Sequence, residues 1–174
     1  MLATKINLLK SAISQRQAYC KLIEKYCGDI EIDFSTELFP TEEDSNKIAQ
    51  YMAKLALKQK KVVAIGPAAS FKGKSWPKQY YLELCEKLLD FNVAVLLVGG
   101  PGDDEPFWIE KQLGKKVTNF AGKLSYLETA ALLNRCDLSI SNDSAIIHFS
   151  EAMDTPALAI FGPTVKEFGY APYR

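Results

Sequence analysis

Residues 138–161 read LSISNDSAIIHFSEAMDTPALAIF, and the order of patterns in this stretch decides the fold. A short strand-like run at 138–141 is followed by a helical pattern at 144–153, and an apolar run follows at 157–161. Two strands joined through a helix pair in parallel, because a hairpin connection is too short to hold a helix. The stretch therefore predicts a β-α-β unit.

The same alternation runs back along the chain to residue 62. We expect strands at 62–66, 93–98, 117–121, 138–141 and 157–161, and helices at 77–90, 104–113, 125–135 and 144–153. The strand runs are apolar rather than alternating, which is typical of a sheet that helices cover on both faces. The sequence therefore predicts an α/β fold with a Rossmann-like parallel sheet and helices on both faces.

The first 60 residues show helical patterns and no strand runs. Apolar residues recur at helical spacing over 5–27, and Gly28 ends this run as a C-cap would. Thr41 and Asp44 form a capping box that opens a second helix, which we expect to reach about Leu57. We therefore expect peripheral helices and an interdomain linker over 1–60, and the main domain over 61–174.

The composition excludes several classes of partner. Lysine plus arginine and aspartate plus glutamate both total 21, so no net field steers the chain to nucleic acid. No apolar run reaches the roughly 18 residues of a membrane span, and the first residues lack the apolar core of a signal peptide. The cysteines, Cys20, Cys27, Cys85 and Cys136, show no zinc-like spacing and sit in apolar stretches. We expect packed, reduced thiols in a cytoplasmic protein.

Small residues follow each expected strand. Gly66, Gly100, Gly122, Ser144 and Gly162 all lie at or just beyond a strand's carboxyl end. Open parallel sheets bind ligands at this edge, and small residues there let a ligand approach the backbone. The alternative at any one position is a tight turn without a functional role. Five such positions at one edge favour a binding site.

The loop at 66–77, GPAASFKGKSWP, offers a contact for an anion. Lys74 is the leading candidate and Lys72 a weaker one, because a compact ammonium pairs with phosphate as a point charge. The alternative is an exposed lysine in a mobile loop. The triplet at 73–75, Gly-Lys-Ser, also matches the end of the P-loop pattern, although Ala68 stands where that pattern requires glycine. A P-loop-like phosphotransferase or NTPase remains an alternative.

The segment after the strand at 138–141 offers a second anion contact. Backbone amides at Ser144 and Ala145 begin a helix, whose positive dipole end favours phosphate. Asp143 precedes them, and His148 shares a helical face with Ser144. His148 is the only histidine, so it cannot belong to a multi-histidine metal site. We expect no metal and no cofactor; the alternative is an ordinary capped helix with a packed histidine.

The segment GGPGDDE at 99–105 carries three acids, Asp103, Asp104 and Glu105. A carboxylate beside a nucleotide site accepts hydrogen bonds from ribose hydroxyls. The alternative is a favourable pairing of each acid with the dipole of the following helix. The segment lacks the third glycine of GxGxxG, which disfavours a nicotinamide-dependent dehydrogenase.

Three segments in order resemble glycosyltransferase family 9, the ADP-heptose:lipopolysaccharide heptosyltransferases. The loop at 66–77 is similar to the family's PGASxxxKxWP, and residues 119–148 are similar to AGKTSLxELAALLxxADLxVSNDSGxxH. Residues 161–174, FGPTVKEFGYAPYR, resemble the family's FGPT segment. The chain departs from these patterns at Ala145, where the family has glycine, and at Pro67-Ala68, where it has Pro-Gly.

The resemblance implies the C-terminal, nucleotide-sugar-binding half of a GT-B glycosyltransferase. Lys74 would contact the donor diphosphate and Asp143 the donor sugar. Ser144 and Ala145 would offer amides to phosphate, and His148 would support that loop or the diphosphate. One of the three acids at 103–105 would hold the ribose, and the resemblance does not choose among them.

The resemblance also implies a reaction and its partners. The full enzyme would transfer heptose with inversion from ADP-heptose to a lipid-linked core oligosaccharide in lipopolysaccharide inner-core biosynthesis. In this family an N-terminal domain binds the acceptor and supplies the catalytic base, and residues 1–60 cannot build one. We therefore expect that domain to be absent, no catalytic residue in this chain, donor binding without turnover, and peripheral membrane association at most, at the inner face of the inner membrane. A noncatalytic interaction module on a transferase fold is a further alternative.

Overall fold

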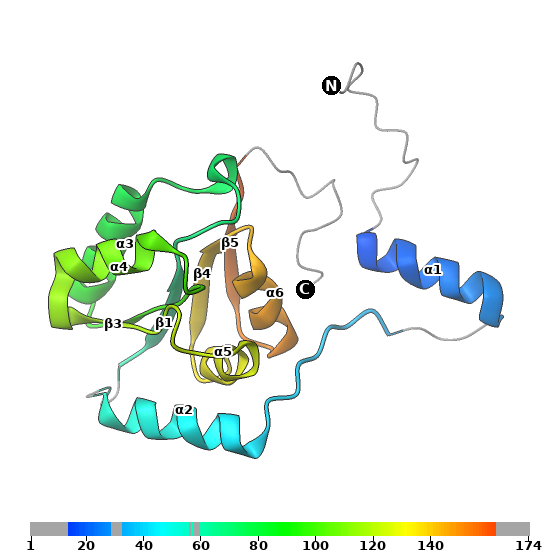
Figure 1. Ribbon diagram of the computed structural model, residues 1–174, viewed down its shortest axis with the longest axis horizontal. Helices are drawn as coiled ribbons and strands as arrows, with labels where there is room; N and C mark the ends of the chain where they lie inside the picture. Colours follow the sequence, from blue (N-terminus) through cyan, green and yellow to red (C-terminus); the bar gives the residue numbers. More distant parts are fainter. Residues whose placement is uncertain (1–13, 29–32, 56, 58–59, 163–174) are drawn as a thin grey trace.

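The computed structural model describes residues 14–28, 33–55, 57 and 60–162 (Figure 1). The elements are α1 (Gln15–Cys27), α2 (Glu42–Lys54), β1 (Val62–Gly66), η1 (Lys72–Lys74), α3 (Lys78–Asp90), β2 (Ala94–Leu97), α4 (Asp104–Leu113), η2 (Gly114–Lys116), β3 (Val117–Asn119), α5 (Tyr126–Leu133), β4 (Leu138–Asn142), α6 (Ala145–Ala152) and β5 (Ala157–Ile160). The start of the helix expected at 5–27, and the segment at 163–174, lie outside the described residues.

The described strands form one parallel sheet in the order β3-β2-β1-β4-β5. The chain builds the sheet outward from β1 to β3 and then crosses back to place β4 on the other side of β1. Gly66 at the end of β1 is in register with Ser141 near the end of β4. The predicted α/β parallel sheet is confirmed, and the strand order reverses between β1 and β4, where such sheets form a crevice.

Helices cover both faces of this sheet (Figure 1). On one face, α3 and α4 bury Tyr81 and Ile109 against alternate strand residues such as Ile65. On the other face, α2 and α5 bury Ile48 and Leu132, and α6 packs at the margin of the same cluster. Each fully buried aliphatic side chain contributes about 1.5–3 kcal/mol through loss of apolar surface from water, so these two layers hold the sheet rigid.

The two helices before residue 60 differ in how they contact the sheet domain. Helix α2 begins at the expected capping box of Thr41 and Asp44, and its Ile48 is fully buried in the core. Helix α1 ends at Gly28 as expected, and its Arg16 pairs with Glu151 of α6 at 3.1 Å. The division of the chain at residue 60 stays a prediction, and α2 packs as part of the sheet domain.

Several elements are shorter than the sequence patterns predicted. Helix α2 ends at Lys54 instead of Leu57, and β3 ends at Asn119 instead of residue 121. Strand β3 stops because the Asn119 side chain accepts a hydrogen bond from the amide of Ala121 at 2.9 Å. Such a side-chain turn redirects the backbone away from the ladder.

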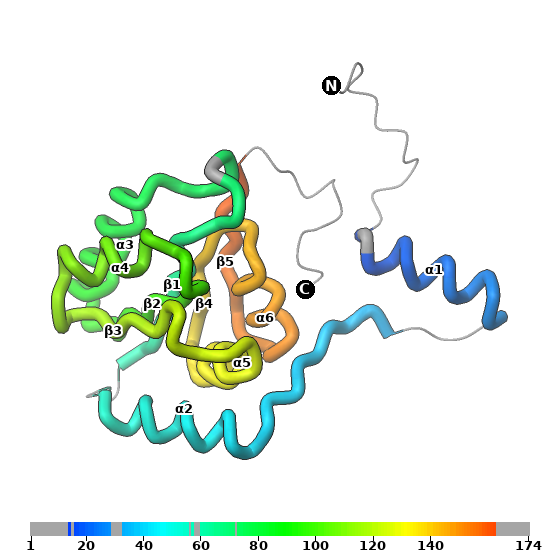
Figure 2. Tube along the Cα trace, viewed as in Figure 1, coloured from blue at the N-terminus to red at the C-terminus, as the bar shows by residue number. Residues whose placement is uncertain are grey.

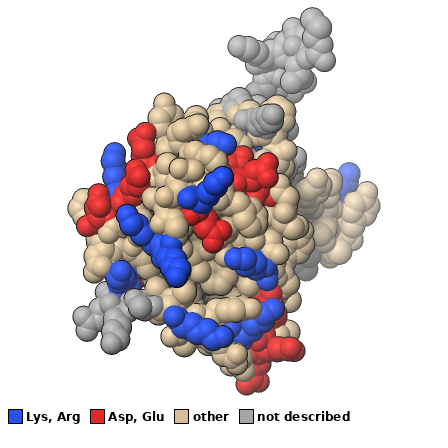
Figure 3. All heavy atoms as spheres, turned by 60° about the vertical axis from the view of Figure 1, so that its left-hand side comes forward, with Lys and Arg blue, Asp and Glu red and all other residues tan. Residues whose placement is uncertain are grey.

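The described surface carries both signs of charge and no candidate membrane span. Figure 3 shows lysine, arginine, aspartate and glutamate side chains interspersed over one face, as expected from equal totals of each sign. No helix among the described residues is long and apolar enough to cross a bilayer.

All four cysteines are free thiols. The expectation that they pack in apolar surroundings is right for Cys85 and Cys136, which are buried, and wrong for Cys27, which is exposed on the last turn of α1; Cys20 is half-buried. Burial raises the pKa of the Cys85 and Cys136 thiols to about 12. The buried pair should therefore be unreactive in the folded protein.

We predict that a thiol reagent will modify Cys27 rapidly at neutral pH and leave Cys85 and Cys136 unmodified until the protein unfolds. A pKa raised from 9.0 to about 12 lowers the thiolate fraction by about a thousandfold, and burial blocks access as well. Mass spectrometry of the alkylated protein, with and without denaturant, measures this. Cys27→Ser should remove the Cys27 adduct and leave the half-buried Cys20 as the remaining accessible thiol. Rapid labelling of Cys85 in the native state would contradict its burial.

Candidate functional site

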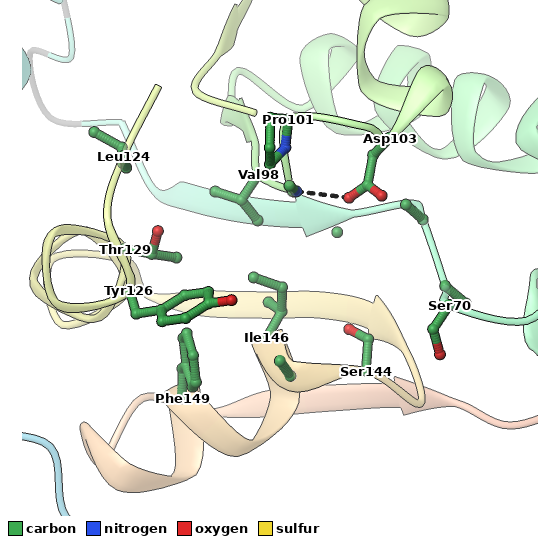
Figure 4. Close-up of a pocket in the computed structure, with 16 residues that line it drawn as sticks. Ser70, Val98, Pro101, Asp103, Leu124, Tyr126, Thr129, Ser144, Ile146 and Phe149 are labelled. Atoms are coloured by element: carbon green, nitrogen blue, oxygen red, sulfur yellow. Dashed lines mark hydrogen bonds between the residues drawn. The ribbon is translucent and has the colours of Figure 1, made fainter. Parts of the chain in front are cut away.

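A cavity of about 480 Å³ opens at the carboxyl edge of the sheet, over the crevice between β1 and β4 (Figure 4). Its walls come from the ends of β1 and β2, the loops that follow them, α5 and the start of α6. Of the residues singled out from the sequence, Gly66, Gly100, Asp103, Ser144 and Ala145 line it. The structure thus brings residues from four segments of the sequence to one cavity.

The floor of the cavity is fixed by contacts between β1 and β4. The Ser141 hydroxyl donates to the Gly66 carbonyl at 2.8 Å and lies 2.9 Å from the Ser144 hydroxyl. A Cβ at Gly66 would lie 2.6 Å from Ser141 Oγ and 3.2 Å from Ile146 Cγ1. Glycine at this position therefore serves the close approach of two strands and a helix.

Lys74 forms an ion pair with Asp143, the residue that precedes Ser144 in the sequence. Lys74 Nζ lies 2.6 Å from Asp143 Oδ2, and the two side chains are 27% and 8% exposed. An ammonium has three protons to donate, so this contact leaves donor capacity for a ligand. The sequence pointed to both residues, and the structure shows that they touch.

The start of α6 lacks a side-chain cap from its own N-cap residue. Ser144 occupies the N-cap position but makes no side-chain cap, because its hydroxyl contacts Ser141 instead. The amide of Ile147 bonds the Ser144 carbonyl at 3.2 Å, so the amides of Ala145 and Ile146 precede the first hydrogen-bonded turn. First-turn amides of this kind are the ones that bind anions at helix starts.

Among the three acids at 103–105, only Asp103 lines the cavity. Its Oδ2 accepts a hydrogen bond from the Gly100 amide at 2.6 Å, which closes the turn after β2 (Figure 4). Asp104 is exposed and Glu105 half-buried in the first turn of α4, outside the cavity lining. Of the three acids, Asp103 is therefore the one that the structure places at the cavity.

Lys74, Asp143, His148 and Gly122 also lie outside the cavity lining. His148 Nδ1 is 3.9 Å from Glu151 Oε2 on the next turn of α6. Gly122 has a φ of +70°, and a Cβ there would lie 2.9 Å from the Pro101 backbone. Its amide donates to the Gly99 carbonyl at 3.0 Å, so Gly122 joins the loops after β2 and β3.

An apolar wall of the cavity was missed by the sequence analysis. Leu124, Tyr126, Ile146 and Phe149 form this wall, and Tyr126 meets Phe149 edge to face with ring centroids 5.8 Å apart. Figure 4 shows the two rings at one end of the cavity and Ser144 at the other. No pattern marked these residues, because single apolar side chains in amphipathic helices are usually core.

The geometry of the loop after β1 differs from that of a P-loop. The P-loop pattern places its Gly-Lys-Ser/Thr at the opening of a helix. Here Lys74 lies in η1, and α3 begins only at Lys78. Among the described residues, no group of three or more histidine, cysteine, aspartate and glutamate side chains is arranged to hold a metal ion.

We predict that Gly66→Ala lowers the free energy of unfolding by about 1–3 kcal/mol, because the added methyl overpacks the contact with Ser141. Urea denaturation followed by circular dichroism measures the change. Gly102→Ala is the matched control, since a Cβ there meets nothing within 4 Å. Equal stability of the two variants would show that the strand ends tolerate more separation than the structure implies.

Comparison with known proteins points to one family. The model of glycosyltransferase family 9 (heptosyltransferase) matches residues 7–174. Lipooligosaccharide heptosyltransferase 2 of Haemophilus influenzae is 24% identical over 184 residues, which cover 92% of this chain and 52% of that protein. The chain thus spans about half the length of the curated relatives it matches first.

Solved structures show the same fold. A glycosyltransferase of family 9 from Veillonella parvula matches 97% of this chain and 49% of its own, with a TM-score of 0.82 and 20% identity. ADP-heptose lipopolysaccharide heptosyltransferase II of E. coli matches 78% of this chain and 42% of its own, with a TM-score of 0.68 and 25% identity. The E. coli heptosyltransferase WaaC, solved with ADP, has a TM-score of 0.63 at 20% identity, over 87% of this chain and 45% of its own.

Proposed function

Because the chain belongs to glycosyltransferase family 9, the heptosyltransferases, we propose that its cavity binds the nucleotide-sugar donor, ADP-heptose. The chain is then the donor-binding half of an inverting heptosyltransferase of lipopolysaccharide inner-core biosynthesis. The observation that carries the proposal is that the Lys74 ammonium pairs with Asp143, the residue that directly precedes the start of α6, and that this helix start borders the cavity. A cation beside the first-turn amides of a helix favours an anionic group.

The diphosphate lies, in our proposal, at the end of the cavity that Ser144 borders. The uncapped amides of Ala145 and Ile146 and the spare protons of Lys74 supply its donors. Asp143 holds the Lys74 ammonium in place. Its carboxylate also accepts a hydrogen bond from a hydroxyl group of the heptose. The positive charge of Lys74 and the amide donors of α6 thus suit a pyrophosphate, and the Asp143 carboxylate suits the sugar attached to it.

The nucleoside occupies the other end of the cavity. The rings of Tyr126 and Phe149, with Leu124 and Ile146, offer an apolar surface for the flat face of a base. Asp103 lies across the cavity from these rings (Figure 4). We propose that its carboxylate accepts hydrogen bonds from the ribose hydroxyls. The E. coli WaaC structures with ADP and with ADP-2-deoxy-2-fluoro heptose support the choice of an ADP-linked donor.

The transfer follows from this placement of the donor. The acceptor hydroxyl attacks the anomeric carbon, the bond from that carbon to the β-phosphate oxygen breaks, and ADP leaves with the electron pair. Lys74 and the α6 amides stabilise the negative charge on the departing ADP, which is the kind of electrostatic effect that enzymes exploit most. The acceptor is a lipid-linked core oligosaccharide, and we place the catalytic base outside these residues. This chain then binds donor without turnover.

We predict that Lys74→Ala lowers the affinity for ADP by roughly 10- to 100-fold, the usual effect of losing a charged hydrogen bond. Isothermal titration calorimetry of the wild-type chain and the variant measures this. Lys116→Ala is the matched control, because Lys116 is exposed in η2 at the amino end of β3. Lys74→Arg, which keeps the charge, should retain part of the affinity.

Three outcomes of this titration would count against the proposal. Equal affinity of wild type, Lys74→Ala and Lys116→Ala would remove Lys74 from the site. Binding that requires magnesium, with release of phosphate from ATP, would favour the P-loop-like phosphotransferase. A folded, monodisperse chain that binds no nucleotide would favour the noncatalytic module.

We predict that Tyr126→Ala weakens ADP binding about 5- to 50-fold and leaves inorganic pyrophosphate binding unchanged, because base–aromatic contacts contribute about 1–3 kcal/mol. Competition titrations with both ligands separate the two ends of the cavity. Phe91→Ala is the control, since Phe91 is an exposed aromatic residue that follows α3. A parallel loss of ADP and pyrophosphate affinity would place the phosphates, instead of the base, against Tyr126.

A further inference from the structure

We propose that Asn142 is a positioning residue, whose buried carboxamide clamps the two ends of the loop at 67–76 and so holds Lys74 in register with the start of α6. The inference rests on the proposed donor site and adds a residue to it that does not touch the donor.

The contacts of Asn142 form the clamp. Asn142 is the last residue of β4 and is fully buried. Its Nδ2 donates to the Pro67 carbonyl at 2.8 Å, and its Oδ1 accepts from the Trp76 amide at 2.9 Å. Pro67 directly follows β1 and Trp76 lies two residues before α3, so one side chain joins the two ends of the loop that carries Lys74.

The identity of the residue follows from this geometry. The clamp needs one donor and one acceptor on a short, planar group, which asparagine supplies and aspartate, serine or leucine does not. Because both loop groups face a buried side chain, loss of the carboxamide leaves the Pro67 carbonyl and the Trp76 amide without their partner. Buried polar groups are rarely left without a hydrogen bond, so the loop has to move until both groups find new partners.

Other contacts of the same loop fix its position, so that the clamp determines where Lys74 lies. Trp76 packs edge to face on Tyr81, with ring centroids 4.9 Å apart, which anchors one end of the loop on α3. At the tip of the loop, a Cβ on Gly162 would lie 2.6 Å from the Gly73 carbonyl, so η1 lies directly against the segment after β5. Figure 2 shows this loop and the end of β5 side by side. Asp143, the next residue after Asn142, then receives the Lys74 ammonium.

The first test observes the loop without any ligand. The sequence has two tryptophans, so Trp108→Phe leaves Trp76 as the sole reporter. In that background we expect Asn142→Ala to shift the Trp76 emission to longer wavelength and to accelerate hydrogen exchange of the Trp76 amide at least tenfold. Ser139→Ala is the matched control: Ser139 is equally buried in β4, and its hydroxyl has no hydrogen-bond partner among the described residues.

The second test asks whether the clamp acts through Lys74. Asn142→Ala should weaken ADP binding about tenfold, the effect of losing well-placed hydrogen bonds, and leave adenosine binding unchanged because adenosine has no phosphate. In a Lys74→Ala background the same substitution should cause no further loss, since coupled residues are not additive. If Asn142→Ala fails to fold, Asn142→Asp keeps the acceptor for Trp76, removes the donor to Pro67 and should give an intermediate loss.

The outcomes separate this inference from the donor proposal. A Trp76 amide that exchanges equally in Asn142→Ala and Ser139→Ala overturns the clamp, as does an equal loss of ADP and adenosine affinity. A fully additive loss in the Lys74→Ala background overturns it as well. Absence of ADP binding by the wild-type chain overturns the donor proposal instead, while the Trp76 measurements still decide whether Asn142 holds the loop.

Discussion

The parallel pairing of β1 with β4 is the constraint on which the rest of this structure depends. It brings Gly66 beside Ser141, so that two segments separated by 75 positions share one strand end. The approach is close enough to leave no room for a side chain at Gly66. Because the strand order reverses here, the loops after β1 and β4 diverge to opposite faces and leave a crevice between them. The cavity, the ion pair and the exposed helix amides all lie around this crevice.

This constraint explains why β4 is polar although it lies inside the sheet. Ser139, Ser141 and Asn142 are fully buried, and Asp143 nearly so. Burial of a polar group is costly unless a partner compensates it. Ser141 contacts Gly66 and Ser144, Asn142 contacts the loop ends, and Asp143 contacts Lys74, so three of the four side chains join β4 to the loops around the cavity. By hydropathy alone, β4 is an atypical buried strand. Its polar side chains make the contacts that hold the loops around the cavity.

Local pattern was sufficient to predict the elements but not their contacts. Helix α4 at 104–113 and β1 at 62–66 were predicted with the observed bounds, because capping, turn residues and apolar periodicity all act over a few residues. The contact of Lys74 with Asp143, the choice of Asp103 among three acids and the wall around Tyr126 depend on strand order, which local pattern does not encode. The exposure of Cys27 was missed for the same reason, since apolar neighbours in the sequence do not show which residues pack against a side chain.

Ala145, where the family pattern has glycine, does not require a glycine backbone conformation. Glycine is favoured where φ is positive, and Ala145 is not among the described residues with positive φ, of which the non-glycine ones are Asn92 and Asp154. Ala145 is instead the first residue of α6 in ordinary helical conformation, with its methyl group at the cavity wall. The substitution therefore leaves the helix amides in place and takes room from the ligand. Any effect of Ala145 on the proposed donor site therefore comes from the volume of its methyl group, because the backbone amides at the start of α6 stay in place.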